Sequence, residues 1–526
     1  MTRYLTYCII ALILISCGTQ ISKVQNQDLT VQPFSVSYLP PVFSNDERKL
    51  KIQKLAPEIE QLIKKHAIAK KIPGIAYGIV VDDELIIASA TGLINLDNKL
   101  PATKNSSFRI ASMTKSFTAM AIMKLRDEGK LSLSDPVAKY IPEMEKLIYL
   151  TSDAPVIDIE NLLTMTAGLP EDNPWGDRQL DETDKMLTDL ISQGVSFSNI
   201  PSYEYEYSNT GFALLGNIVS KVSGKPFQEY ISENILKPLG MEHTFWEFST
   251  ISQDQLAIGY RWEDEQWEKE PMLHDGSYGA MGGLITSIED FGKYVSFHLS
   301  AWPPRSDEDT GPVKRSTLRE MQTPQFAQLY ANGKDWNGKP CPSIRGYGYG
   351  LGIIKNCTGR TCVSHGGALP GFGSNYAFYP EYGVGVMAFC NLTYTSPYPL
   401  LEIEQLLFEK AGLQPRILPV SDILVIRKDQ VVKIIRDWDA DTETEILAEN
   451  FYLDESREHW KTEIKEMFDK AGEIKSIGNI NPENQLRGSF DIKTLNGVIS
   501  VFFTLSPENN PKLQELDISF QQNDSK

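Results

Sequence analysis

Apolar residues surround almost the whole of one predicted helix, which begins near Ser112. From there the chain runs without proline or glycine as far as Gly129, and Phe117, Met120 and Leu125 are among its apolar positions. A helix that is apolar nearly all round is buried in a large domain, and glycine commonly follows a helix end. The pattern therefore predicts a buried helix over residues 112–128.

The segments on either side alternate between helical and strand patterns. Apolar residues at helical spacing cover residues 51–70, and two β-rich runs then meet at Asp82-Asp83, which predicts a hairpin. The other predicted elements are helices ending at Gly224 and near Gly412, a glycine-rich turn and helix from Gly279, strands within 346–367, and a hairpin at 373–391. These elements indicate a mixed α/β domain over residues 51–415.

A second, smaller domain is expected beyond Pro419. Two helical patterns, around 441–452 and 456–470, precede four strand patterns between residues 474 and 520. Two helices followed by four strands indicate a small α+β domain over residues 420–526. It carries no catalytic cluster that the sequence reveals, so its role is unknown.

The N-terminus has the pattern of a bacterial lipoprotein signal. Arg3 precedes an apolar run of signal-peptide length, and Leu14-Ile15-Ser16-Cys17 resembles a lipobox, whose cysteine becomes the lipidated first residue. We expect a signal peptide over residues 1–17, lipidation of Cys17, and a polar tether over residues 18–50. The protein would then be lipid-anchored in a bacterial cell envelope, facing the periplasm or exterior.

Charge and metal-ligand spacing exclude several classes of function. The chain has 51 Lys and Arg against 69 Asp and Glu, a net charge of −18, which argues against a nucleic-acid partner. Its six His and six Cys form no HExxH or paired CxxC motif. We therefore expect neither a metal nor a cofactor, and a small-molecule or peptide substrate.

The predicted central helix opens with the only Ser-x-x-Lys in the chain, Ser112 and Lys115. Residues three apart share one helical face, so the lysine amine can reach the serine hydroxyl. A serine becomes a useful nucleophile only when a base takes its proton, and a lysine can do so if burial lowers its pKa. The pattern alone leaves two interpretations open, nucleophilic catalysis and a surface pair that happens to be three residues apart, and the motifs further along the chain decide between them.

Two further motifs follow in an order that suits such chemistry. Tyr207-Ser208-Asn209 precedes a predicted helix and offers a phenol for proton transfer; the rival Tyr330-Ala331-Asn332 lies in a polar loop. His365-Gly366-Gly367 ends an apolar run, and its glycines would let a substrate approach a strand edge closely. The rival His274-Asp275-Gly276 is expected in a loop.

With these motifs in order, the sequence resembles the serine β-lactamase and penicillin-binding-protein-like superfamily, in its class C β-lactamase and DD-peptidase branch. The resemblance covers roughly residues 50–412, and the segments LLTMTAGLP, YSNTGFALLG and GYGYGLG are also typical of it. It implies an antiparallel sheet flanked by helices plus an all-helical subdomain. Two departures, IPSYEYEYSN before the second motif and Met165 in place of a usual histidine, concern the shape of the cleft.

The resemblance also implies a role for each motif residue. Ser112 would be the acylated nucleophile, Lys115 its activator and Tyr207 the proton shuttle. Asn209 would position substrate and Lys115, and the N–H groups of Ser112 and Ala368 would form the oxyanion hole. The implied substrate-binding set is Asn209, His365, Gly366, Gly367 and Ala368.

These roles indicate a serine hydrolase that acts through an acyl-enzyme on amides or esters, of β-lactamase, D-alanyl-D-alanine peptidase or esterase type. The alternative is a catalytically silent binding or sensor protein on the same fold. His365 stands where many relatives have lysine, so it either binds a carboxylate as imidazolium or only hydrogen-bonds as a neutral ring. For the cysteines, we expect a disulfide between Cys357 and Cys362 across a hairpin turn.

Overall fold

The computed structural model describes residues 38–523. The predicted signal peptide, Cys17 and most of the predicted tether therefore lie outside the described residues. Within the described part, no helix combines the length and apolar character needed to cross a bilayer.

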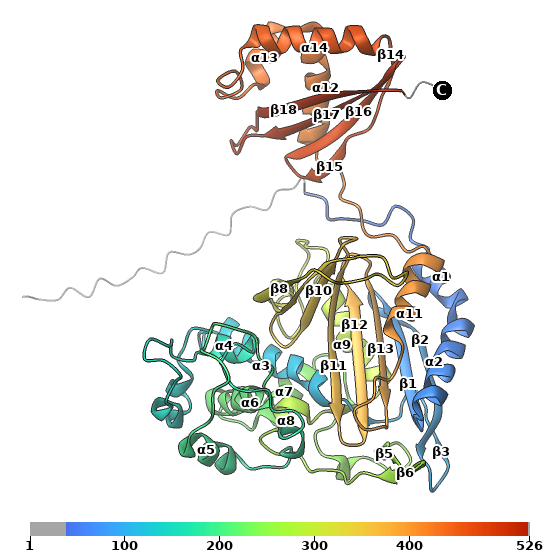
Figure 1. The fold of residues 1–526 in the computed structure, drawn as a ribbon, viewed down its shortest axis with the longest axis vertical. Coiled ribbons are helices and arrows are strands. Elements are labelled where there is room, and N and C mark those ends of the chain that lie inside the picture. The colour runs from blue at the N-terminus through green and yellow to red at the C-terminus, as the bar shows by residue number, and fades with distance from the viewer. Residues whose placement is uncertain (1–37, 524–526) are drawn as a thin grey trace, which may run out of the picture. The chain divides into compact units, whose positions relative to one another are not determined.

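The large domain is built on one nine-stranded antiparallel sheet (Figure 1). Its strands lie in the spatial order β3-β2-β1-β13-β12-β11-β10-β9-β8. Their bounds are β1 (Gly74–Val81), β2 (Glu84–Asn95), β3 (Leu100–Pro101), β8 (Phe326–Tyr330), β9 (Ser343–Tyr347), β10 (Gly352–Asn356), β11 (Thr361–Leu369), β12 (Phe372–Tyr379) and β13 (Val384–Cys390). The predicted hairpins β1–β2 and β12–β13 are confirmed, and the first and last parts of the domain meet where β1 pairs with β13.

Helices cover both faces of this sheet and bury two separate cores. On one face lie α1 (Arg48–Lys54), α2 (Ala56–Lys70) and α11 (Leu400–Gln405), whose apolar residues pack with Ile75 and Ile79 of β1 (Figure 1). On the other face, α9 (Ile288–Ser300) and α3 (Lys115–Asp127) pack with Ala76 and Val80 of the same strand. Alternate residues of a strand point to opposite faces, so β1 contributes to both cores.

An all-helical region beside the sheet supplies one wall of the site (Figure 1). Its helices are α4 (Ile159–Leu163), α5 (Asp184–Gln193), α6 (Asn209–Ser223), α7 (Phe227–Ile231) and α8 (Gly279–Gly282). Elsewhere in the domain lie α10 (Arg315–Met321) and the short pairs β4 (Phe108–Arg109) with β7 (Ile285–Thr286) and β5 (Tyr260–Glu263) with β6 (Gln266–Lys269). The polar segment 171–206 contains α5, because Thr183 caps its first turn and Leu187 and Ile191 are buried.

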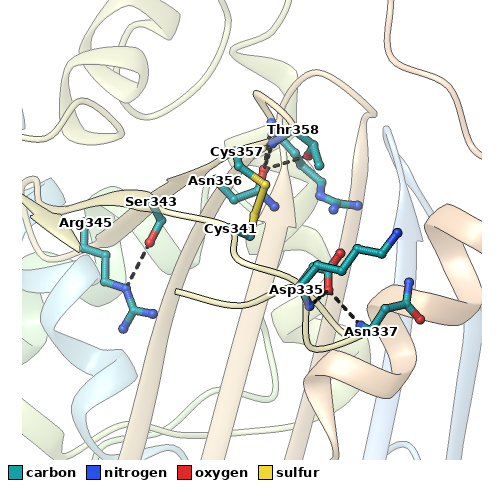
Figure 2. Close-up of a disulfide and its surroundings, with 10 residues drawn as sticks. Asp335, Asn337, Cys341, Ser343, Arg345, Asn356, Cys357 and Thr358 are labelled. Atoms are coloured by element: carbon teal, nitrogen blue, oxygen red, sulfur yellow. Dashed lines mark hydrogen bonds between the residues drawn. A yellow bond between two sulfur atoms is a disulfide. The ribbon is translucent and has the colours of Figure 1, made fainter. Parts of the chain in front are cut away.

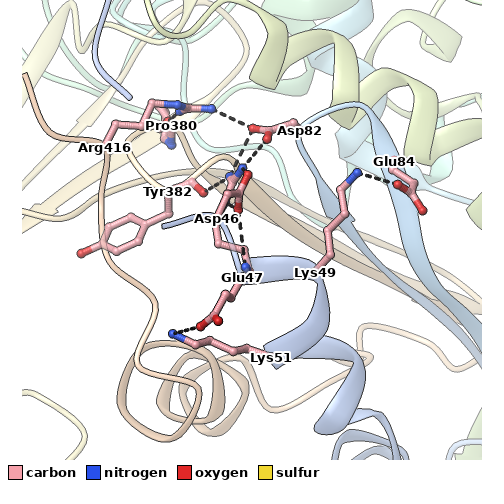
Figure 3. A network of polar contacts seen from close by, with 10 residues as sticks. Asp46, Glu47, Lys49, Lys51, Asp82, Glu84, Pro380, Tyr382 and Arg416 are labelled. Carbon is pink, nitrogen blue, oxygen red and sulfur yellow. Dashed lines mark hydrogen bonds and ion pairs between the residues drawn. The ribbon is translucent and has the colours of Figure 1, made fainter. Parts of the chain in front are cut away.

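The segments that begin and end the large domain both contact Asp82, in the turn between β1 and β2 (Figure 3). Asp82 accepts hydrogen bonds from Arg48 and, at 2.7 Å, from Arg416, while Val42 and Ile417 exchange two backbone hydrogen bonds of 2.9 and 2.8 Å. Arg48 is 3% exposed, so its charge needs these partners. The ordered domain therefore begins before residue 51, and the last part of the predicted tether belongs to the fold.

The C-terminal domain is a sheet covered on one face by helices (Figure 1). The helices are α12 (Asp422–Asp437), α13 (Ala440–Ile446) and α14 (Arg457–Ala471), and the strands are β14 (Ile474–Ile477), β15 (Asn481–Asn484), β16 (Arg487–Thr494), β17 (Gly497–Leu505) and β18 (Leu513–Gln522). The predicted α+β class is confirmed. The structure adds α12 and one short strand to the two helices and four strands that the pattern predicted.

The predicted Cys357–Cys362 disulfide is wrong, because Cys357 is bonded to Cys341 (Figure 2). Cys341 lies just before β9 and Cys357 just after β10, and these strands pair with Ser343 opposite Asn356. Cys362 instead stands opposite Ile354 within the β10–β11 ladder and is a free thiol. The pairing of β9 with β10 therefore brings Cys341, not Cys362, to the hairpin turn.

Candidate active site

Ser112 lies in a tight 3₁₀ turn, Ala111–Thr114, that leads directly into α3. Ala111 has a φ of +49°, a left-handed conformation that is costly for a residue with a side chain. The turn is fixed from both sides, since the Ser374 hydroxyl donates to the Ile110 carbonyl at 2.6 Å and the Leu284 N–H donates to Thr114 Oγ1 at 3.2 Å. The predicted helix is confirmed, with the serine in its first turn and Gly129 after its end.

The Lys115 amine is buried beside the serine. Its Nζ lies 3.0 Å from Ser112 Oγ, 2.7 Å from Asn209 Oδ1 and 3.0 Å from the Met281 carbonyl oxygen. A neutral amine has two N–H donors and one lone pair, and the amide and carbonyl oxygens can only accept. The two donors are therefore used by Asn209 and Met281, and the lone pair faces the Ser112 hydroxyl.

Burial gives Lys115 the protonation state that a base needs. The side chain is fully buried, and this loss of hydration lowers its pKa from 10.5 to about 7, against the opposing effects of Asp177 and Asp172. A substantial fraction of the amine is then neutral at pH 7. The condition set by the sequence analysis, a lysine whose pKa is lowered by burial, is thus present.

Tyr207 completes the group around the serine. Its ring lies 4.9 Å from Lys115 Nζ, and its hydroxyl hydrogen-bonds to Ser112. Burial raises the pKa of Tyr207 well above 10, more than the hydrogen bond to Ser112 lowers it. The phenol is therefore protonated at neutral pH and can act as a proton donor, which leaves Lys115 as the available base.

Asn209 is held by a loop that the sequence analysis did not identify as part of the site. Its Nδ2 donates to Asn173 Oδ1 at 2.6 Å and to Asp177 Oδ1 at 3.4 Å, which turns its Oδ1 toward Lys115. Asp172 accepts from the backbone N–H groups of Asn209 and Thr210 at the start of α6. The loop thus fixes the orientation of the amide that contacts Lys115.

Asp177 also acts on the site through its charge. It is 1% exposed, and burial raises its pKa to about 6, while Lys115 and hydrogen bonds to Tyr394 and Asn209 oppose that rise. No motif marks this residue. Only the folded loop shows which acid of the polar segment 171–206 points at Asn209.

The third motif lies on β11, beside the turn that carries Ser112. A Cβ added to Gly367 would lie 2.2 Å from the Ile110 oxygen and 2.3 Å from Ser374 Oγ, so glycine is required for this close approach. Gly366 and Ala368 flank it on the same strand. The structure therefore brings Gly367 against the Ser112 turn, as the motif order suggested.

His365 is a neutral hydrogen-bonding residue. Its Nδ1 lies 2.5 Å from the Gly366 carbonyl oxygen and its Nε2 lies 3.0 Å from the Tyr347 hydroxyl. Because a carbonyl only accepts, Nδ1 carries the proton and Nε2 accepts from Tyr347. Burial, together with the nearby Lys115, lowers the pKa of His365 to about 4. In the free protein these contacts and this pKa favour the neutral, hydrogen-bonding alternative over the imidazolium.

The rival motifs lie away from the serine. Tyr330 ends β8 and stacks on Arg345, and neither touches Ser112 or Lys115. His274 is exposed in a loop, where its Nδ1 pairs with Glu247 at 3.1 Å. Within residues 38–523, one group could hold a metal ion, Glu455, His459 and Glu463 on or beside α14, and it belongs to the C-terminal domain.

The comparisons with known proteins agree with this geometry. A family model described as Beta-lactamase matches residues 59–408. Protein flp of Staphylococcus aureus (strain MW2) is 28% identical over 341 residues, which are 64% of this chain and 63% of that protein. Beta-lactamase-like protein 2 of Dictyostelium discoideum is 29% identical over 382 residues, 69% of this chain and 66% of that protein. The matched region thus spans less than two thirds of each relative.

Two solved structures share the fold. An octameric penicillin-binding protein homologue from Pyrococcus abyssi has a TM-score of 0.54 at 24% identity, covering 89% of this chain and 98% of its own. EstCE1, a hydrolase with promiscuous acyltransferase activity, has a TM-score of 0.56 at 19% identity, covering 68% and 99%. Since the family model covers more than half of a chain that carries this buried serine and lysine, the chain belongs to the Beta-lactamase family.

Proposed function

We propose that this protein is a serine hydrolase that acts through an acyl-enzyme on amide or ester substrates. One observation carries the proposal: a buried lysine amine lies 3.0 Å from a serine hydroxyl, and burial lowers its pKa to about 7, so its neutral form can accept the hydroxyl proton. Because burying an amine is costly, this arrangement argues against a catalytically silent binding or sensor protein.

In the acylation step, Lys115 accepts the Ser112 hydroxyl proton as Oγ attacks the substrate carbonyl carbon. The carbonyl π electrons move to oxygen, and the N–H groups of Ser112 and Ala368 would stabilise this oxyanion. When the tetrahedral intermediate collapses, the bond to the leaving group breaks. Tyr207 gives the leaving group its proton and regains one from Lys115.

In the deacylation step, a water molecule replaces the leaving group. Lys115 takes a proton from the water as it attacks the ester carbon of acylated Ser112, and passes this proton to Ser112 Oγ. The ester bond breaks, Ser112 recovers its proton, and the carboxylic acid product is released. Asn209 keeps Lys115 oriented through both steps.

Four substrate classes fit this chemistry: β-lactams, peptidoglycan stem peptides, other D-amino-acid peptides and small esters. A hydrolysis screen across these classes, with Ser112→Ala as the control, tests the proposal. Turnover of at least one class by the wild type, lost in the variant, is expected. Absence of turnover together with absence of covalent labelling at Ser112 would favour the binding or sensor alternative.

We also propose that the protein is lipid-anchored at Cys17 in a bacterial cell envelope and faces the periplasm or exterior. The lipobox-like Leu14-Ile15-Ser16-Cys17 supports this. Fractionation tests it, because Cys17→Ser should lose lipid labelling and membrane retention. Equal retention of both proteins without any lipid label would contradict it.

A further inference from the structure

A cavity of about 400 Å³ opens beside the catalytic tyrosine and the third motif. Tyr207 and His365 line it together with residues of β8, β9 and β10. Its lining is mainly aromatic and aliphatic, with Tyr205, Phe326, Leu329, Tyr330, Tyr347, Ile353 and Ile354 among the residues. A substrate held at Ser112 can therefore extend an apolar group into this space.

Arg345 is the one permanently charged residue that lines the cavity. Its guanidinium lies 3.9 Å from the ring centre of Tyr330, and its Nε donates to Ser343 Oγ at 3.4 Å (Figure 2). Across residues 38–523, no carboxylate forms an ion pair with it. Stacking on Tyr330 fixes the plane of the guanidinium and leaves N–H donors free for an anion.

Arg345 and Tyr347 lie on the same strand, β9, and both line the cavity together with Tyr207 and His365. Arg345 and Tyr347 are two residues apart, so they share one face of the strand. The Tyr347 hydroxyl in turn hydrogen-bonds to His365 at 3.0 Å. Gly352 stands opposite Tyr347 on β10, and a Cβ there would meet no atom closer than 3.4 Å, which leaves space between the rows of side chains.

In the free protein His365 is held between the Gly366 carbonyl and the Tyr347 hydroxyl and its pKa is lowered by burial, so Arg345 is the charge that the cavity offers to an anionic substrate. A planar guanidinium matches a carboxylate in a bidentate geometry, and its positive charge does not depend on pH in the working range. We infer that Arg345 is a specificity-determining residue that binds a carboxylate group of an amphiphilic ester or amide substrate. The apolar body of that substrate lies among the aromatic residues of the cavity.

This inference rests on the proposed hydrolase function, and three ester probes test it. The neutral probe is 4-nitrophenyl hexanoate. One anionic probe is the 4-nitrophenyl monoester of adipic acid, with the carboxylate on the acyl chain, and the other is 4-carboxyphenyl hexanoate, with the carboxylate on the leaving group. Each is assayed with the wild type, Arg345→Gln and Arg345→Lys.

Arg345→Gln should lower kcat/KM for at least one anionic probe by about 10- to 100-fold, the weight of a lost hydrogen bond to a charged group. The neutral probe should change less than about twofold, because a hydrogen bond to an ion is lost only where an ion is present. Arg345→Lys should recover part of the loss, since it keeps the charge without the bidentate geometry. Lys355→Gln is the matched control, because it removes a positive charge from the next strand in a different cavity.

The pH dependence separates Arg345 from His365. The ratio of kcat/KM for the anionic and neutral probes should stay constant between about pH 6 and pH 9, whereas a histidine would lose its effect as pH rises above about 6.5. An equal change for all three probes in Arg345→Gln, or no change in any, would overturn the inference. Failure of the proposed function would look different, because the neutral probe would not be hydrolysed and Ser112 would not be labelled.

Discussion

Asp177→Asn should move the acid limb of the pH–rate profile to lower pH. The limb of kcat/KM for a neutral ester reports the loss of a proton from the base, which is Lys115 with a pKa lowered to about 7. Asp177 raises the pKa of Lys115 against the larger effect of burial. When this negative charge is removed, the protonated amine is less stable, so the pKa of Lys115 falls further.

The structure sets the size of this shift. Asn209 bridges the two groups, with 2.7 Å from Lys115 Nζ to Oδ1 and 3.4 Å from Nδ2 to Asp177 Oδ1. The charges are therefore within about 8 Å, since the amide itself spans about 2.3 Å between oxygen and nitrogen. At an effective dielectric constant of about 20, that distance gives about 2 kcal/mol, or about 1.5 pKa units.

Asparagine is nearly the size of aspartate and can still accept from Asn209, so the orientation of Asn209 should survive. The assay is kcat/KM for 4-nitrophenyl hexanoate from about pH 5 to pH 9, since this ester has no group that titrates there. At pH 6 the variant should reach a fraction of its own plateau up to about eightfold larger than the wild type does, the full factor applying where Asp177 is ionised in the wild type. The plateau itself should fall modestly, because a base of lower pKa is weaker.

Asp189→Asn is the matched control, because Asp189 is exposed on α5 and pairs with Lys185. It should leave the limb in place, as a screened surface charge does. An acid limb in Asp177→Asn that stays within about 0.3 pH units of the wild type, or moves upward, would refute the electrostatic reasoning about Lys115.

Three further substitutions probe the site and its support. Tyr207→Phe should lower kcat by about 10²–10⁴, the weight of one proton-transfer group, while Tyr330→Phe should cost less than about tenfold; the reverse order would identify the wrong tyrosine. Gly367→Ala should lower acylation at least about tenfold, because its Cβ would push the strand away from the nucleophile turn, and unchanged burst kinetics would contradict this. Cys341→Ser should lower the free energy of unfolding by about 3 kcal/mol, as expected for loss of a disulfide that closes a loop of this length. Cys362→Ser should not reproduce that loss. Equal denaturation midpoints for Cys341→Ser and the wild type would argue against the disulfide.

The motifs that lie close together in the chain were predicted well from the sequence. Ser112 and Lys115 are held by a single helical turn, so their spacing alone predicts their contact. Tyr207 lies just before α6, Ser208 caps the helix and Asn209 is its first residue, and the apolar pattern of that helix is evident in the sequence. Local geometry was enough to identify these residues.

Features that depend on the pairing of distant segments were not predictable in the same way. Cys341 meets Cys357 only because β9 and β10 pair in one register. The short turn between Cys357 and Cys362 suggested Cys362 as the partner, which is wrong. Asp177 lies in a polar segment without periodicity, so nothing in the sequence separates it from its acidic neighbours. The charge of His365 depends on burial, which a motif does not report.

The missed helix α12 shows how local preference can mislead. Its residues 422–437 are rich in valine and isoleucine, which favour strands because they are branched at Cβ. In the structure, Ser421 caps the first turn, and Leu424, Val431 and Ile435 pack against the sheet of the C-terminal domain. Tertiary packing therefore outweighs the intrinsic preference in this segment.

The most direct test of the account is covalent labelling of the nucleophile. The full-length protein is treated with a fluorophosphonate, and the site is located by mass spectrometry of a digest. The account predicts one modified residue, Ser112, with a labelling rate that rises as pH increases through about 7, the pKa of Lys115. Ser112→Ala should not be labelled. Labelling of another residue, or equal labelling of wild type and Ser112→Ala, would contradict the claim that Ser112 and Lys115 form the catalytic pair.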